Sequence, residues 1–142
     1  MRNVPCICVT ESTDSIIRFG EKRSVIRFHN NNRLLFKKVQ VDGCAITDGI
    51  KCDYLLCSEN EQDEYFIELK GSDISHAIDQ LRATILQLGE YNNNRHAFVV
   101  CTNVAPILST EIQRAKSEFK QRFNSDLLIK KNSVRTLVIN FL

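Results

Sequence analysis

Two short runs decide how this sequence is interpreted: CDYLL at Cys52–Leu56 and, after a polar segment, YFIELKG at Tyr65–Gly71. Both runs are apolar and rich in β-forming residues, yet each carries charged side chains where a buried strand normally has none. Burial of an unpaired carboxylate is costly, so two carboxylates and a lysine in such runs indicate a functional site. The arrangement suggests a site that binds a metal ion.

The polar segment Ser58–Asp63 has no strand pattern and is expected to join the two runs as the loop of a β-hairpin. Pairing across the centre of this loop places Cys57 opposite Glu64. The same register, carried four residues further, places Asp53 opposite Glu68. The sequence thus predicts two carboxylates that face each other across a strand pair.

Side chains alternate along a strand, so Lys70 is expected on the same face as Glu68 and Asp53. Directly opposed like charges repel each other. A divalent cation between the two carboxylates would turn this repulsion into coordination, and hard oxygen ligands suit Mg²⁺ or Mn²⁺. Lys70 would lie one step further along, where it could orient a water molecule or stabilise developing negative charge.

Asp53, followed by Glu68-x-Lys70 at the end of an apolar strand and then by a helix, resembles the core of the PD-(D/E)XK nuclease superfamily. This superfamily includes restriction endonucleases and archaeal Holliday-junction resolvases. The resemblance covers about residues 33–102 and departs from the named pattern at Cys52, where the pattern has proline before the aspartate.

The resemblance implies an α/β fold with a restriction-endonuclease-like αβββαβ core, a mixed central sheet flanked by helices. It also implies that Asp53 and Glu68 bind the metal ion, and that Lys70 assists the attack of water on a phosphodiester. A glutamine on the next helix reaches the site in parts of the superfamily, and Gln80 is the best-placed candidate. A solvent-facing role for Gln80 is the alternative.

Many relatives also place an acidic residue of the first helix in the site. Glu11 and Glu21 are both candidates for that position, because no spacing selects between them.

A solvated strand face with weak ion pairs is the plainer interpretation of an isolated Glu-x-Lys. However, both faces of the two strands carry apolar residues. One face has Tyr54, Leu56, Ile67 and Leu69, and the face with the charged residues has Leu55 and Phe66. A buried, functional site is therefore the better fit.

We predict a divalent-metal-dependent endonuclease that hydrolyses phosphodiester bonds of nucleic acid, with DNA as the favoured substrate, in bacterial defence, repair or a mobile element. Its further partner would be a second copy of the chain in a homodimer, or another protein. The alternative is a catalytically silent module that keeps the nuclease fold and acts in a protein or nucleic-acid complex.

Length and composition are those of a small globular protein: 142 residues, 43% of them hydrophobic and 25% charged, predict a single domain over residues 1–142. The net charge of +2 is small, so affinity for phosphates would have to come from local basic clusters. Three such clusters exist: Arg27, Arg33, Lys37 and Lys38; Arg114, Lys116, Lys120 and Arg122; Lys130 and Lys131. No run is long and apolar enough for a signal peptide or a membrane helix, so a cytoplasmic protein is expected.

The six cysteines form no C-x-x-C pair and are expected to be reduced, mostly as core residues. A zinc site built from Cys44, Cys52 and Cys57 is a weaker alternative, because these spacings fit no structural zinc pattern.

The remaining elements follow from periodicity and turn signals. After Gly71, Ser72 or Asp73 can cap a helix whose apolar positions run from Ile74 to Leu88. The apolar run 96–101 follows this helix and is expected to pair in parallel through the crossover. The other expected elements are a helix at 13–19, strands at 25–28 and 34–41, a helix from Ser109 and a last strand at 134–141.

Overall fold

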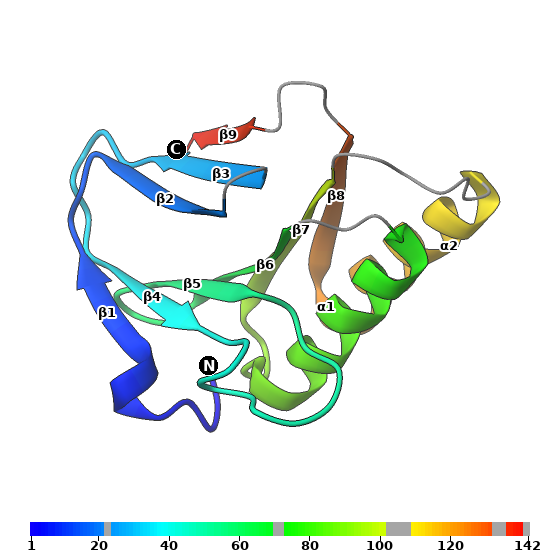
Figure 1. The fold of residues 1–142 in the computed structure, drawn as a ribbon, viewed down its shortest axis with the longest axis horizontal. Helices are drawn as coiled ribbons and strands as arrows, with labels where there is room; N and C mark the ends of the chain where they lie inside the picture. The colour runs from blue at the N-terminus through cyan, green and yellow to red at the C-terminus, as the bar shows by residue number, and fades with distance from the viewer. Residues whose placement is uncertain (22–23, 70–72, 102–108, 132–135, 141–142) are drawn as a thin grey trace.

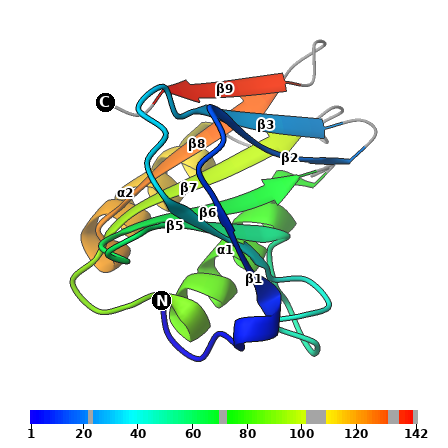
Figure 2. The same cartoon turned by 90° about the vertical axis from the view of Figure 1, so that its left-hand side faces the viewer.

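The computed structural model describes residues 1–21, 24–69, 73–101, 109–131 and 136–140. Within these ranges the chain has an α/β fold with a six-stranded mixed sheet, a three-stranded sheet and two α-helices (Figure 1). The helices cover one face of the six-stranded sheet and the smaller sheet covers the other (Figure 2). The six-stranded sheet is therefore the middle layer of the molecule.

The six-stranded sheet has the order β1-β4-β5-β6-β7-β8. Its strands are β1 (Val9–Ser12), β4 (Phe36–Gln40), β5 (Tyr54–Ser58), β6 (Asp63–Leu69), β7 (Asn94–Cys101) and β8 (Ser125–Lys131). Pairing is antiparallel from β1 to β6 and parallel from β6 to β8. Each parallel step is bridged by a helix, α1 (Ile74–Leu88) and then α2 (Ser109–Phe123), as a crossover connection requires.

The three-stranded sheet has the order β2-β3-β9, with β2 (Ile16–Glu21), β3 (Ser24–His29) and β9 (Thr136–Asn140). β2 and β3 form an antiparallel hairpin, and β9 pairs in parallel with β3. A single 3-10 turn, Cys6–Cys8, precedes β1. The second sheet is thus built from segments at opposite ends of the described chain.

Apolar residues fill both interfaces of the middle sheet, because its central strands are buried on both sides. Leu55 and Phe66 face the helices, together with the apolar stripe of α1. Leu56 and Ile67 face the second sheet, where Phe28 supplies a fully buried ring. Central strands covered on two faces are usually nearly continuous apolar runs, which is the pattern of β7 from Ala97 onward, whereas β6 departs from it at Glu64 and Glu68.

The prediction for α1 is confirmed. The helix begins at Ile74, Asp73 caps it by accepting a hydrogen bond from the His76 N–H at 3.1 Å, and it ends before Gly89. The predicted apolar positions are all buried: Ile74, Ala77, Ile78, Leu81, Ile85 and Leu88. The parallel pairing of β7 with β6 is confirmed as well.

The helix predicted near the N-terminus is wrong, whereas the strand predicted at 134–141 exists as β9 but does not join the middle sheet. The expected helix at 13–19 is a strand, because Ile17 and Phe19 alternate with exposed neighbours and pack on the middle sheet. The last strand of the middle sheet is β8, which follows α2 directly, whereas the predicted C-terminal strand forms β9 in the second sheet. Local alternation does not specify which sheet an alternating segment joins.

The cysteines differ in part from the expectation that all are reduced. Cys8 and Cys44 form a disulfide that ties the start of β1 to the segment after β4. Cys52, Cys57 and Cys101 are buried and are not in a disulfide, as predicted, and Cys6 is exposed. Since Cys44 is in the disulfide, its thiolate is not available for the alternative zinc site.

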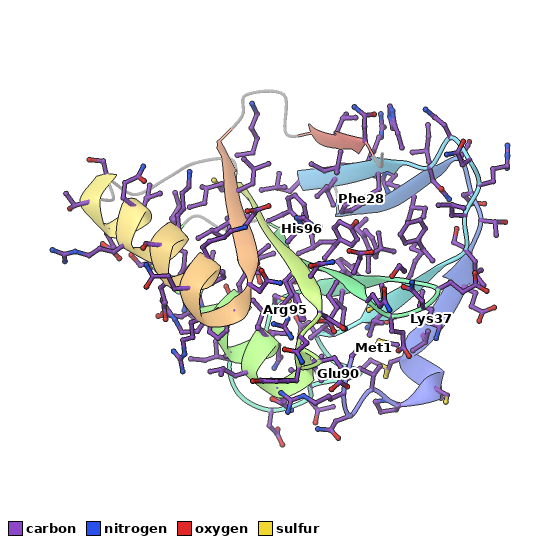
Figure 3. All side chains as sticks on the ribbon, turned by 180° about the vertical axis from the view of Figure 1, so that it is seen from behind. Met1, Phe28, Lys37, Glu90, Arg95 and His96 are labelled. Carbon is purple, nitrogen blue, oxygen red and sulfur yellow. A yellow bond between two sulfur atoms is a disulfide. The ribbon has the colours of Figure 1, made fainter. Side chains whose placement is uncertain are left out.

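A buried ionic cluster lies where β6 and β7 begin (Figure 3). The Glu64 carboxylate is fully buried, accepts a hydrogen bond from Arg95 Nε at 2.9 Å and lies 3.0 Å from the Met1 amino group. It also accepts from the backbone N–H of Glu90, and Arg95 donates to the Phe123 carbonyl. These contacts satisfy a charge that would be costly to bury alone.

No helix in the described ranges is long and apolar enough to span a membrane.

Phe28 provides a test of the packing between the two sheets. Its ring lies edge-on to Tyr65 and Phe98, with centroid distances of 5.6 and 5.7 Å. We expect Phe28→Ala to lower the free energy of unfolding by about 3–5 kcal/mol, because it leaves a cavity in this interface. Val138→Ala on the same sheet, where the side chain is 44% exposed, should change it by less than about 0.5 kcal/mol. Urea unfolding measures both, and equal effects would contradict the assigned interface.

Candidate functional site

The register of the β5–β6 hairpin matches the prediction as far as the strands pair. Cys57 lies opposite Glu64, and the ladder continues to Tyr54 opposite Ile67. The two faces are also as predicted, with Leu55 and Phe66 on one side and the residues that contact the second sheet on the other. The predicted pairing of Asp53 with Glu68 would lie one step beyond the last pair of this ladder.

Asp53 is held at the open end of the hairpin by its backbone and its side chain. Its N–H donates to the Ile67 carbonyl at 3.1 Å, and its Oδ2 accepts a hydrogen bond from the Leu69 N–H at 2.8 Å. Its own carbonyl accepts from the N–H groups of Val41 and Asp42. The half-buried carboxylate is therefore fixed over the end of β6.

Glu68 lies in β6 with only 5% of its surface exposed, on the face that α1 covers. Its neighbour on that face is the fully buried thiol of Cys52. The pKa of this thiol is raised to about 12, chiefly by burial and further by the negative charges of Glu68 and Asp53. Both carboxylates therefore act on one buried thiol, which stays protonated at neutral pH.

Helix α1 holds the segment that leads into Asp53. Gln80 Nε2 donates to the Lys51 carbonyl at 3.0 Å, and one turn later Thr84 Oγ1 accepts from the Cys52 N–H at 2.8 Å. The Thr84 hydroxyl in turn donates to the Gln80 carbonyl at 2.8 Å. Two side chains at i and i+4 on one helix face thus fix the two residues before Asp53.

Gln80 is partly buried and its amide holds the backbone of Lys51, two residues before Asp53; its predicted role in the site stays a prediction. Lys70, the predicted third member, lies outside the described residues. Thr84 and Cys52 are parts of the site that the sequence reasoning missed. The signal that could have found Thr84 is its position one turn after Gln80, on the buried side of the helix.

The structure places the two candidate acidic residues of the N-terminal segment on strands. Glu11 lies opposite Lys37, which lies opposite Cys57, so Glu11 is aligned with a point on β5 that is four residues, or roughly 13 Å, from Asp53. Glu21 ends β2, and its side chain is not described. Glu11 is thus separated from the site along the strands.

Among the described residues there is no group of three or more His, Cys, Asp and Glu side chains placed to hold a metal ion. Mg²⁺ is commonly held by one or two carboxylates, with waters and substrate phosphates completing its six ligands. The carboxylate oxygens of Asp53 and Glu68 are hard ligands of the type that this ion prefers, whereas the Cys52 thiol beside them is a soft ligand. The residues present therefore fit Mg²⁺ or Mn²⁺ better than Zn²⁺.

A separate cavity of about 800 Å³ opens at the other end of β6, between the two sheets. The Tyr65 and His96 rings stack there with centroids 5.0 Å apart, and His96 Nδ1 lies 3.4 Å from Asp126 Oδ2. Burial raises the pKa of Tyr65 to about 12. The sequence does not reveal this cluster, because it requires the unpredicted β8 beside β7.

Comparison of the chain with protein-family models, with curated proteins and with solved structures gives no match. The function is therefore argued from the geometry of the site and from the resemblance of its motif.

Thr84 offers a test of how the segment before Asp53 is held. Thr84→Val keeps the shape of the side chain but leaves the buried Cys52 N–H without its acceptor, so the free energy of unfolding should fall by about 1–3 kcal/mol. Thr84→Ser keeps the hydroxyl and should lose less. Chemical denaturation measures the free energy of unfolding of the two variants. A Val variant as stable as the parent would argue against a stabilising hydrogen bond between Thr84 and the Cys52 N–H.

Proposed function

We propose that this chain is a divalent-metal-dependent endonuclease of the PD-(D/E)XK type, which hydrolyses phosphodiester bonds of nucleic acid. The observation that carries the proposal is the register of the β5–β6 hairpin: continued one step beyond Tyr54 opposite Ile67, it places Asp53, directly before β5, opposite Glu68 of β6. Like charges opposed across a strand pair repel each other, and a cation bound between the two carboxylates would offset this repulsion.

The order of elements around the site supports the same proposal. Three antiparallel strands, β4, β5 and β6, are followed by α1 and by β7 parallel to β6. This order corresponds to the βββαβ part of the core that the resemblance implies. The first helix of that core is replaced here by strands β1 and β2, so the proposal rests on the part of the chain from β4 onward.

Each residue has a role in the proposed site. Asp53 and Glu68 hold the metal ion through carboxylate oxygens, and the Leu69 N–H fixes the direction of the Asp53 carboxylate. When bound, Mg²⁺ or Mn²⁺ supplies Lewis-acid chemistry that acidifies a water molecule and offsets charge on the phosphate. Lys70, two residues after Glu68, orients that water and stabilises the negative charge that develops on the phosphate oxygens.

Gln80 and Thr84 act as positioning residues. Both bind the backbone immediately before Asp53, so they determine where its carboxylate lies relative to Glu68. Misplacement of a metal ligand by about an ångström is enough to lower catalysis strongly.

The substrate that we propose is DNA, by the resemblance, with a second copy of this chain or another protein as a further partner. The competing function is a silent binding module. The observation that favours it is the burial of Glu68, which at 5% exposure suits a structural ion pair as well as a metal ligand. The two functions differ in whether the site binds a cation and cleaves.

Metal binding can be tested by thermal unfolding with and without Mn²⁺. A ligand that binds only the folded state stabilises it by mass action, so a Mn²⁺ concentration of about 100 times Kd should raise Tm by roughly 5–10 °C. Asp53→Asn keeps the shape of the side chain but removes its charge, and should abolish most of this rise. Asp63→Asn, at the other end of the hairpin, is the matched control and should keep it. No rise in the parent, or an equal rise in Asp53→Asn, would count heavily against the site.

Catalysis can be tested with single-stranded, duplex and branched DNA and with RNA. The parent should cleave at least one of these in Mn²⁺ and none in EDTA. Lys70→Met keeps the length of the side chain but removes the ammonium group, and should lower turnover about a hundredfold or more, as should Glu68→Gln. Gln80→Ala should lower turnover while Tm changes little, because Gln80 is only partly buried.

The variants must remain folded for this test to be valid, which circular dichroism can establish. A folded parent that cleaves none of the substrates would make the binding module the better account. Unfolding of Lys70→Met would instead assign the lysine to a structural ion pair.

A further inference from the structure

Three basic residues lie on neighbouring strands of the two sheets: Arg18 of β2, Arg27 of β3 and Lys38 of β4. We call them the basic surface. Arg18 and Arg27 are directly opposed across β2 and β3, and both are exposed. Lys38 rises from β4 to the β2 edge, where its Nζ donates to the Arg18 carbonyl at 3.3 Å. The three cations therefore form a strip that crosses from one sheet to the other.

The arrangement places like charges side by side. Side chains that are directly opposed in an antiparallel pair have Cβ atoms about 5 Å apart, and like charges at such positions destabilise the pair. Among the described residues none forms an ion pair with Arg18, Arg27 or Lys38. An anion lying across the strip would offset this repulsion.

A groove of about 310 Å³ adjoins the strip. Arg18 and Lys38 line it, and its described lining includes no Asp or Glu: Ile7, Cys8, Thr10, Arg18, Phe19, Gly20, Lys38, Val39, Gln40 and Tyr54. The groove therefore has two cationic groups and no described carboxylate to compete with a phosphate.

Both cations in the groove are held in place. The Lys38 ammonium lies 5.0 Å from the centre of the Phe19 ring, a favourable cation–π position. The Arg18 guanidinium lies over Gly20, where a Cβ would come within 3.2 Å of its Nη2. Side chains that are already positioned lose less conformational entropy when they bind a ligand.

The groove ends beside the proposed active site. Gln40 and Tyr54, which form the last pair of β4 and β5, line one end of it. Tyr54 directly follows Asp53 in the chain. Tyr54 packs on the side of the second sheet, whereas Asp53 and Glu68 belong to the face that α1 covers. A strand that follows the groove past Tyr54 would therefore reach Asp53 by passing around the end of the middle sheet.

We propose that the basic surface and its groove bind the phosphate backbone of the nucleic-acid substrate and guide it to Asp53. The inference rests on the proposed function for the substrate's class, but it concerns binding and can be tested without cleavage. It also selects among the basic clusters of the sequence: phosphate contacts come from β2, β3 and β4 and not from α2 or the end of β8.

The test measures binding of fluorescently labelled single-stranded and duplex DNA by anisotropy in EDTA, over a series of salt concentrations. The logarithm of the binding constant falls linearly with the logarithm of the salt concentration, and we call this gradient the salt slope. Each phosphate contact contributes about 0.9 to it for duplex DNA and about 0.7 for a single strand. The variant Arg18→Gln/Arg27→Gln/Lys38→Gln should therefore bind at least tenfold more weakly and reduce the slope by about 2–3. Arg18→Gln/Arg27→Gln, which leaves Lys38 and its contact with Phe19 intact, should show an intermediate loss.

The matched control removes the same charge from α2, which covers the other face of the middle sheet, as Arg114→Gln/Lys116→Gln/Lys120→Gln. It should leave both affinity and salt slope nearly unchanged. Equal losses in the two triple variants would mean that only net charge matters, and would overturn the proposal. Unchanged affinity in the folded variants of the basic surface would overturn it as well.

The outcome for the basic surface is distinguishable from the outcome for catalysis. If the parent binds DNA through these residues but cleaves nothing in Mn²⁺, the proposal that the basic surface binds DNA is supported and the nuclease proposal fails. If the parent cleaves DNA and the basic-surface variants bind and cleave it equally well, the nuclease proposal is supported and the proposal that the basic surface binds DNA is contradicted.

Discussion

The pairing register of β5 and β6 is the constraint on which the candidate site depends. Cys57 opposite Glu64 fixes it at one end and Tyr54 opposite Ile67 at the other. A slip of one residue would move the side chains of one strand to the opposite face, and would carry Glu68 away from Cys52 and α1. The two apolar cores prevent such a slip, because it would expose the residues that each core buries.

Helix α1 contributes more than cover for the sheet. Its apolar stripe packs on β6 and β7, and the flanking Gln80 and Thr84 bind the backbone that precedes Asp53. The same helix therefore stabilises the fold and sets the position of one carboxylate. On the opposite face, the second sheet adds a layer that brings Arg18 next to Lys38 of β4, with Arg27 on the adjoining strand.

The hairpin and α1 could be predicted because their signals are local. Alternation, a polar loop and an N-cap followed by a helical stripe specify these elements without reference to the rest of the chain. The second sheet could not be predicted in this way, since β9 joins β3 from more than 100 residues away. The Cys8–Cys44 disulfide depends in the same way on long-range proximity. For the site, the sequence predicted the two carboxylates and Gln80 but not Thr84, whose partner is a backbone group rather than a charged residue.

A crystal structure of the protein soaked in Mn²⁺ tests the central claim most directly. The account predicts one anomalous scattering peak between the carboxylates of Asp53 and Glu68, with metal–oxygen distances close to the roughly 2.1 Å typical of Mg²⁺ sites. The peak should be absent in crystals of Asp53→Asn. A fully soaked crystal with no peak there, and with Glu68 in an ion pair to a lysine instead, would contradict the account and assign this part of the chain a structural role.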